Sequence, residues 1–118
     1  MPLRHRQRDA LATSSVSSTP DGDVRVVIRG ALDGEGAAAV ARDVRWAALR
    51  SRSVVTIDYS RGGFVDSSGL RLLIEAEQIA SARHIEFRLR PSGALQQLLE
   101  MTGLTRLGQL DRGFPVGA

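Results

Sequence analysis

The chain has 118 residues, of which 42% are hydrophobic and 25% charged, a composition typical of one globular domain. It contains no cysteine, which excludes disulfide bonds and thiolate metal sites, and its two histidines, His5 and His84, are too far apart in sequence to suggest a metal cluster. The net charge is only +3, and the sixteen basic residues, all arginine, are interleaved with acids, which argues against direct nucleic-acid binding. No stretch approaches the roughly 20 apolar residues of a membrane-spanning helix, so we expect no membrane insertion.

The first part of the chain predicts a tail followed by a β-hairpin. Residues 1–10 are polar and arginine-rich, which is typical of a flexible tail, and residues 11–118 are expected to form a single domain. A weak strand pattern covers residues 11–18. After a turn rich in Pro, Asp and Gly, the β-branched residues of 24–28 predict a second strand.

The middle of the chain predicts a helix and then a buried strand. Apolar residues at helical spacing indicate a helix over 37–49, and the β-branched run 54–57 indicates a strand in the interior of a sheet. Residues 61–63 are glycine-rich and predict a loop. We expect Phe64 and Val65, which follow this loop, to return to the core.

The remaining elements complete an α/β pattern. Residues 67–82 carry a wide apolar arc and a narrow polar strip, which predicts a largely buried helix packed on a sheet. Apolar and charged residues alternate over 85–89, which indicates a half-exposed strand, and 94–101 predict a short helix. Residues 104–118 are weakly patterned. The order β-β-α-β-α-β-α predicts a mixed sheet of four to five strands covered by helices.

The segment Asp66-Ser67-Ser68-Gly69 opens the strongest predicted helix and allows two interpretations. In the first, a side-chain oxygen of Asp66 or Ser67 caps the helix by accepting from a free N–H group, worth about 1 kcal/mol. In the second, an exposed hydroxyl is phosphorylated, because free N–H groups and the positive end of the helix dipole favour a phosphate there. About two added negative charges beside Asp66 would then repel a docked partner. Ser67 is the preferred acceptor because we expect it at the cap, with Ser68 in the first turn.

Two further polar segments follow predicted strands. Asp33 comes after the second strand, where it caps or precedes the next helix, and Asp58-Tyr59-Ser60 ends the third strand. Because loops after the carboxyl ends of parallel strands meet at one edge of a sheet, we expect both segments near Ser67.

The motifs of common enzymes are absent from the sequence. It has no phosphate-binding glycine loop, no dinucleotide fingerprint and no Gly-x-Ser-x-Gly element. His84 is the only histidine downstream of Ser67, and it lies near the other end of the same predicted helix, roughly 24 Å away at 1.5 Å per residue. We therefore predict no catalytic residue, no metal site and no cofactor, and keep a small enzyme as a minor alternative.

Several segments in order resemble the STAS domain of bacterial anti-sigma factor antagonists. The resemblance extends over about residues 24–107 and implies a small sheet covered by helices, which agrees with the pattern above. Its strongest part is Asp66-Ser67-Ser68-Gly69-Leu70. The other segments that carry it are Gly30-Ala31-Leu32-Asp33, Val54 to Ser60, Pro91-Ser92 and Leu98 to Leu104.

The resemblance also implies a function. Such a cytoplasmic protein binds a serine kinase that doubles as an anti-sigma factor, and so regulates sigma-dependent transcription in stress response or sporulation. The kinase phosphorylates the serine that follows the motif aspartate, which breaks the complex, and a phosphatase resets it. Carried over, Ser67 is the phosphoacceptor. The loop around it is shaped by Asp66, Ser68 and Gly69, and the partner-binding residues are Asp33, Leu32, Ser60 and Arg71.

The sequence departs from the family pattern at three places, and the last two leave an alternative open. Ala31 stands where the family usually has an acid, Arg61-Gly62-Gly63 lengthens a loop that is usually shorter and more apolar, and the usual C-terminal helix is missing. The alternative is a STAS module without a phosphorylation switch, such as a stressosome-type scaffold subunit or the cytoplasmic subunit of a lipid transporter. A scaffold predicts a large assembly.

Overall fold

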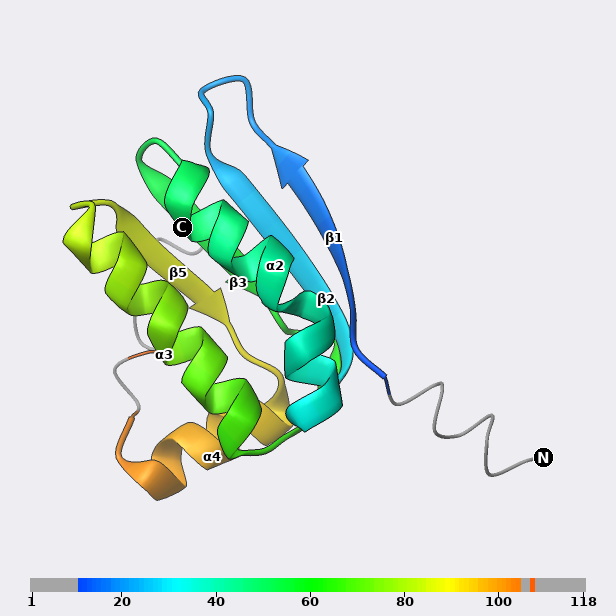
Figure 1. Cartoon of the computed structure of the whole chain (residues 1–118). Helices are drawn as coiled ribbons and strands as arrows, with labels where there is room; N and C mark the ends of the chain where they lie inside the picture. Colours follow the sequence, from blue (N-terminus) through cyan, green and yellow to red (C-terminus); the bar gives the residue numbers. More distant parts are fainter. Residues whose placement is uncertain (1–10, 105–106, 108–118) are drawn as a thin grey trace.

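The computed structural model describes residues 11–104 and residue 107, and in this part of the chain helices pack against a β-sheet (Figure 1). The order of elements is β-β-α-β-β-α-β-α, which confirms the predicted α/β class and adds one strand. The predicted tail and residues 108–118 lie outside the described residues. No helix in the described part is long and apolar enough to cross a bilayer. The elements are β1 (Thr13–Ser18), β2 (Val24–Leu32), α2 (Gly34–Arg50), β3 (Val54–Asp58), β4 (Gly62–Val65), α3 (Ser67–Ala82), β5 (Glu86–Arg90) and α4 (Gly93–Thr102).

The sheet is mixed, as predicted. Its strands follow the order β1-β2-β3-β5, and β4 pairs with the end of β2. β1 is antiparallel to β2, whereas the other pairings are parallel. Helices α2 and α3 lie side by side on one face, and α4 packs against β4 (Figure 1). Because Leu32 pairs with Val65, the last residues of β2 and β4 lie together, and so do the starts of α2 and α3 that follow them.

The hydrophobic core fills the space between the sheet and the two long helices. Strand residues alternate between this core and the opposite face, which is the period of two that the sequence showed. Only one aromatic side chain of the strands, Phe87, lies in the core, and small residues of α2 and α3 allow the helices to pack closely. The central residues of the core include Val26, Ile28, Val40, Val44, Ala47, Val55, Ile57, Leu73, Ala76, Ala80 and Leu89.

Strand β4 was not predicted. Gly62 and Gly63, expected in a loop, belong to this strand, and Gly30 of β2 pairs with Gly62. The expectation that Phe64 returns to the core is wrong, because its side chain is 62% exposed while that of Val65 is buried. Alternation along a strand places adjacent side chains on opposite faces, so only one of the two could face the core.

The face of the sheet opposite the helices carries an ion pair between neighbouring strands. Arg25 Nη2 of β2 lies 2.6 Å from Asp58 Oδ2 at the end of β3. Asp58 Oδ1 accepts from both the backbone N–H and the hydroxyl of Ser60. Burial raises the pKa of the Asp58 carboxyl, but the hydrogen bonds from Ser60 and the charge of Arg25 outweigh burial, so this pKa lies below its ordinary value.

The lowered pKa predicts a pH dependence of stability. A carboxyl with a folded-state pKa below its unfolded-state pKa stabilises the fold above the unfolded value, and this contribution is lost as pH falls through the folded value. In Asp58→Asn we expect the free energy of unfolding at pH 7 to fall by about 1 kcal/mol, since Arg25 is half exposed. Its further loss from about pH 5 to pH 3 should be smaller than in the parent. Urea denaturation across this pH range measures both effects.

The matched control is Asp21→Asn, which changes an exposed carboxylate in the turn between β1 and β2. It should reproduce the pH dependence of the parent. Equal pH slopes for Asp58→Asn and the parent would contradict the stabilising role of the Asp58 carboxylate.

Candidate functional site

Asp66 is the cap of helix α3. Its backbone is extended, and its Oδ1 accepts from the N–H groups of Ser68 and Gly69 at 2.8 and 3.3 Å. Its carbonyl oxygen accepts the first intrahelical hydrogen bond, from Leu70 N. Ser67 is therefore the first residue inside the helix and not the cap, which corrects the expected position by one residue. The side chain of Ser67 is exposed, Ser68 is half-buried and Gly69 is buried.

The first turn of α3 packs closely against the end of β2. The backbone N–H of Asp66 donates to the carbonyl oxygen of Leu32 at 3.2 Å. A Cβ at Gly69 would overlap that oxygen and would lie 2.6 Å from the Leu32 Cβ, so only glycine allows the helix to begin this close. The Leu32 side chain is fully buried and lies beneath the predicted partner face rather than on it.

A second helix begins beside the first. Asp33 caps α2, and its Oδ1 accepts from Gly36 N at 2.8 Å. The Cβ position of Gly34, the first residue of α2, lies 4.0 Å from Ser68 Oγ. Two helix N-termini, each with an aspartate cap, thus lie next to each other, as expected from the positions of Asp33 and Asp66 after their strands. The positive ends of both helix dipoles point to the same surface.

A family model described as the Mlab, STAS domain matches residues 15–110, which is most of the chain. The chain belongs to the STAS domain family. No curated protein sequence matches it.

Solved structures of anti-sigma factor antagonists share this fold. An anti-sigma factor antagonist from Mycobacterium paratuberculosis has a TM-score of 0.69 and 24% identity, with 80% of each chain covered. The antagonist SpoIIAA in its unphosphorylated form has a TM-score of 0.67 and 18% identity, with 80% of this chain and 84% of that chain covered. Bacillus SpoIIAA in its phosphorylated form has a TM-score of 0.63 and 18% identity, with 80% and 87% covered.

The hydroxyl of Tyr59, a residue to which the sequence assigned no role of its own, holds β4 of this STAS domain in place. The hydroxyl lies 2.5 Å from the carbonyl oxygen of Gly30 and 3.0 Å from that of Phe64, to which it can donate, and it accepts from Gly63 N. A Cβ at Gly62 would overlap the Tyr59 ring. Tyr59 and the glycine pair Gly62-Gly63 therefore hold in place the strand that leads into Asp66. The short spacing between the tyrosine and the glycine pair was the sequence signal that could have indicated this strand.

Ser60 and Arg71 lie at different places relative to Ser67, the predicted acceptor. Ser60 is exposed, but its hydroxyl donates to Asp58 at 2.6 Å, and within the described residues no hydrogen bond joins it to Ser67. Arg71 is exposed and follows Ser67 by four residues, so both lie on the same side of α3. Of these two expected partner residues, Arg71 is the one that shares a surface with Ser67.

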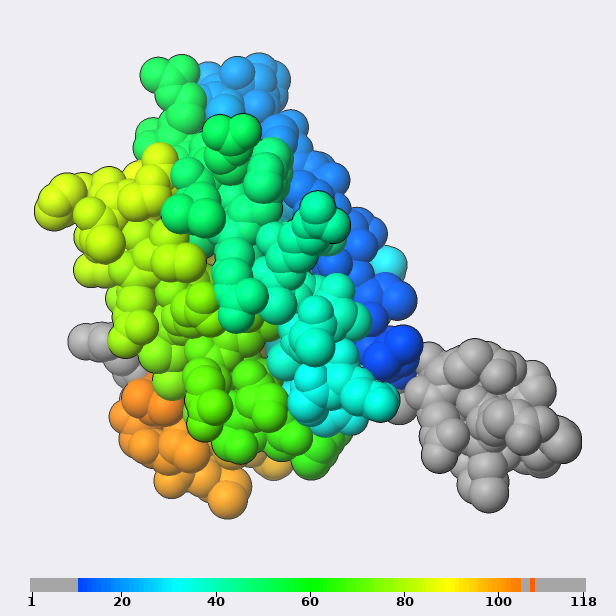
Figure 2. Space-filling model, viewed as in Figure 1, coloured from blue at the N-terminus to red at the C-terminus, as the bar shows by residue number. Residues whose placement is uncertain are grey.

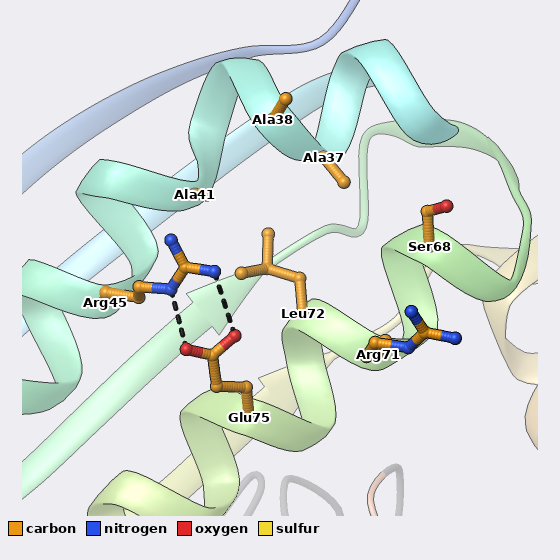
Figure 3. A pocket seen from close by; sticks show the side chains of 8 residues that line it. All are labelled: Ala37, Ala38, Ala41, Arg45, Ser68, Arg71, Leu72 and Glu75. Atoms are coloured by element: carbon orange, nitrogen blue, oxygen red, sulfur yellow. Dashed lines mark hydrogen bonds and ion pairs between the residues drawn. The ribbon is translucent and has the colours of Figure 1, made fainter.

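A shallow hollow lies between the N-terminal halves of α2 and α3 (Figure 3). It has a volume of about 130 Å³, with an alanine-lined wall on α2 and Ser68 and Arg71 at its α3 edge. Arg45 closes one end by a two-pronged ion pair with Glu75, at 2.7 and 3.1 Å, which holds the pKa of Glu75 below its ordinary value. Figure 3 shows Arg71 turned away from this pair, on the side of Ser68.

The close approach at Gly69 predicts a steric effect of substitution. In Gly69→Ala, the new methyl group meets the Leu32 backbone, so the start of α3 must shift, and we expect the free energy of unfolding to fall by about 1–3 kcal/mol. Gly93→Ala is the matched control, since Gly93 begins α4 and an added Cβ there has nothing within 4 Å. That change should be neutral or stabilising by up to about 1 kcal/mol. Equal urea midpoints for the two variants would contradict the packing described here.

Proposed function

We propose that this STAS domain is an anti-sigma factor antagonist whose binding to a serine kinase is switched by phosphorylation of Ser67. The observation that carries the proposal is the exposed Ser67 hydroxyl on the first residue of α3, beside the start of α2. Support comes from the fold shared with anti-sigma factor antagonists, one of which is described in both a phosphorylated and an unphosphorylated form.

The surroundings of Ser67 suit a change of charge at the surface. Its neighbours in the helix, Gly69 and Leu70, are buried and anchor the first turn, whereas Ser67 faces solvent. A phosphate there adds about two negative charges next to Asp66 and near Asp33. The unmodified surface has these two carboxylates, that of Glu35 in the first turn of α2, and the cation of Arg71, so phosphorylation makes the surface strongly acidic without adding atoms to the core.

The same geometry explains why the phosphorylated form would remain folded. A phosphate on the first residue of a helix interacts favourably with the positive end of the helix dipole, and Arg71 four residues later offers a cation on the same side. Loss of binding would then come from repulsion and altered contacts at the partner surface, not from unfolding. We propose that Asp33 and Arg71 contact the kinase on either side of Ser67.

The proposed partners follow from this switch. The unmodified domain binds a serine kinase that also holds a sigma factor, and a phosphatase acting on phosphorylated Ser67 restores binding. The domain itself catalyses no step in this scheme. Because the kinase uses ATP and the sigma factor works on the transcription machinery, we propose that the domain acts in the cytoplasm.

A kinase assay tests the switch directly. Purified kinases of the anti-sigma class from the same genome are incubated with ATP and the wild-type protein, Ser67→Ala or Ser68→Ala, and the products are mapped by mass spectrometry. We expect one phosphate on the wild type and on Ser68→Ala, at position 67, and none on Ser67→Ala. Phosphorylation should weaken binding of the kinase by about tenfold or more, a loss of about 1.4 kcal/mol.

Ser68→Ala is the informative control because its hydroxyl is one residue away and half-buried. Phosphate on Ser68 instead of Ser67 would show that the acceptor is wrongly assigned. Failure of both the modified and the unmodified domain to bind any such kinase would overturn the proposed function.

A further inference from the structure

Strand β1 forms an edge of the sheet. It pairs with β2 on one side, and no strand in residues 11–104 pairs with its other side. Figure 1 shows β1 along the outer margin, next to β2, and Figure 2 shows it at the flank of the molecule. Edge strands in monomeric proteins are usually protected by a charge, a proline or a bulge. The sequence of β1, Thr-Ser-Ser-Val-Ser-Ser, contains no charge and no proline, and its register with β2 is unbroken.

The sequence of β1 is also symmetric about its single apolar residue. In an antiparallel pair of two copies centred on Val16, each Val16 lies opposite the other, Ser15 lies opposite Ser17, and Ser14 lies opposite Ser18. No like charges face each other in this register, and every polar pair is small. Such self-complementarity is what a two-fold interface between identical chains requires.

An exposed aromatic residue lies on α2, the helix that contacts β1. Val16 pairs with the buried Val26, so its side chain is on the face of the sheet that the helices cover, where it is 40% exposed. Ser14 Oγ donates to Asp43 Oδ2 at 2.6 Å, which fixes α2 relative to β1. Trp46 follows Asp43 by three residues and is 43% exposed.

Helix and strand geometry places the side chains of Val16 and Trp46 at about the same position along the shared direction of β1 and α2. β1 is antiparallel to β2, and α2 runs back from β2 to the parallel β3, so β1 and α2 run in the same direction. From the Ser14–Asp43 contact, Val16 lies about 6.6 Å along the strand and Trp46 about 4.5 Å along the helix. Trp46 is therefore placed to cover a pair of valines at the centre of a joined sheet.

We propose that β1 pairs with β1 of a second copy of this chain, centred on Val16, to form a two-fold dimer with one continuous sheet. The two Trp46 side chains, one from each copy, cover the valine pair on the helix-bearing face. The two-fold axis reverses the strands, so the two Ser67 sites lie at opposite ends of the dimer and stay accessible. This proposal does not depend on phosphorylation of Ser67.

The absence of cysteine allows a direct test in the full chain. In Val16→Cys the only thiols of a dimer would be those of two opposing residues, whose Cβ atoms are about 5 Å apart in an antiparallel pair. We expect this variant to form a disulfide-linked dimer under mild oxidation. Met101→Cys is the control: Met101 is 81% exposed on α4, and this variant should cross-link far more slowly.

Sedimentation velocity over a dilution series tests the same interface without cross-linking. The wild-type chain and Met101→Lys should dimerise, whereas Val16→Lys, which sets two ammonium groups opposite each other, should remain monomeric. A wild-type chain that stays monomeric at every concentration would overturn the proposal. So would a dimer that Val16→Lys leaves intact and that Val16→Cys fails to cross-link, because its interface must then lie elsewhere. If circular dichroism shows that Val16→Lys does not fold, the cross-linking of Val16→Cys compared with Met101→Cys still tests whether β1 forms the interface.

Discussion

The contact of Leu32 with the first turn of α3 fixes the geometry on which the rest of the site depends. The Leu32 carbonyl oxygen accepts from Asp66 N–H, and the bare backbone of Gly69 lies against the same residue. Leu32 also pairs with Val65 and immediately precedes Asp33, the cap of α2. One buried residue at the end of a strand therefore sets the position of both helix starts. The position of the exposed Ser67 hydroxyl therefore depends on that buried contact.

Much of this arrangement could be predicted because its signals are local. The strict apolar periodicity of residues 67–82 gave the bounds of α3, and the alternation over 85–89 gave β5 to within one residue. The aspartates at positions 33 and 66 were expected at helix starts, because a short side-chain acceptor before an apolar period is the sequence mark of a cap. Their closeness followed from the rule that loops after parallel strands share one edge of the sheet.

The sequence analysis missed features that depend on contacts between distant parts of the chain, or on glycines, which have no side chain to form a pattern. Gly62 and Gly63 carry no alternation that could indicate a strand. They form β4 because this segment pairs with the end of β2, where Gly30 is the partner of Gly62, and because the Tyr59 hydroxyl holds the Gly63 backbone in place. Asp66 and Ser67 can both cap a helix, so the sequence left open which of them does. The backbone geometry decides for Asp66. That Leu32 is buried while its neighbour Asp33 reaches the surface likewise follows from packing against Gly69.

The central proposal is that Ser67, a surface serine, gains charge on phosphorylation while the core beneath it stays unchanged. Its most direct test is an amide spectrum, by nuclear magnetic resonance, of the chain with phosphoserine installed at position 67 during synthesis, compared with the unmodified chain. The account predicts that shift changes are confined to the starts of α2 and α3, around residues 33–36 and 66–71, and that β3 and β5 are unaffected. Changes that spread through the core strands, or a loss of the folded spectrum, would contradict it.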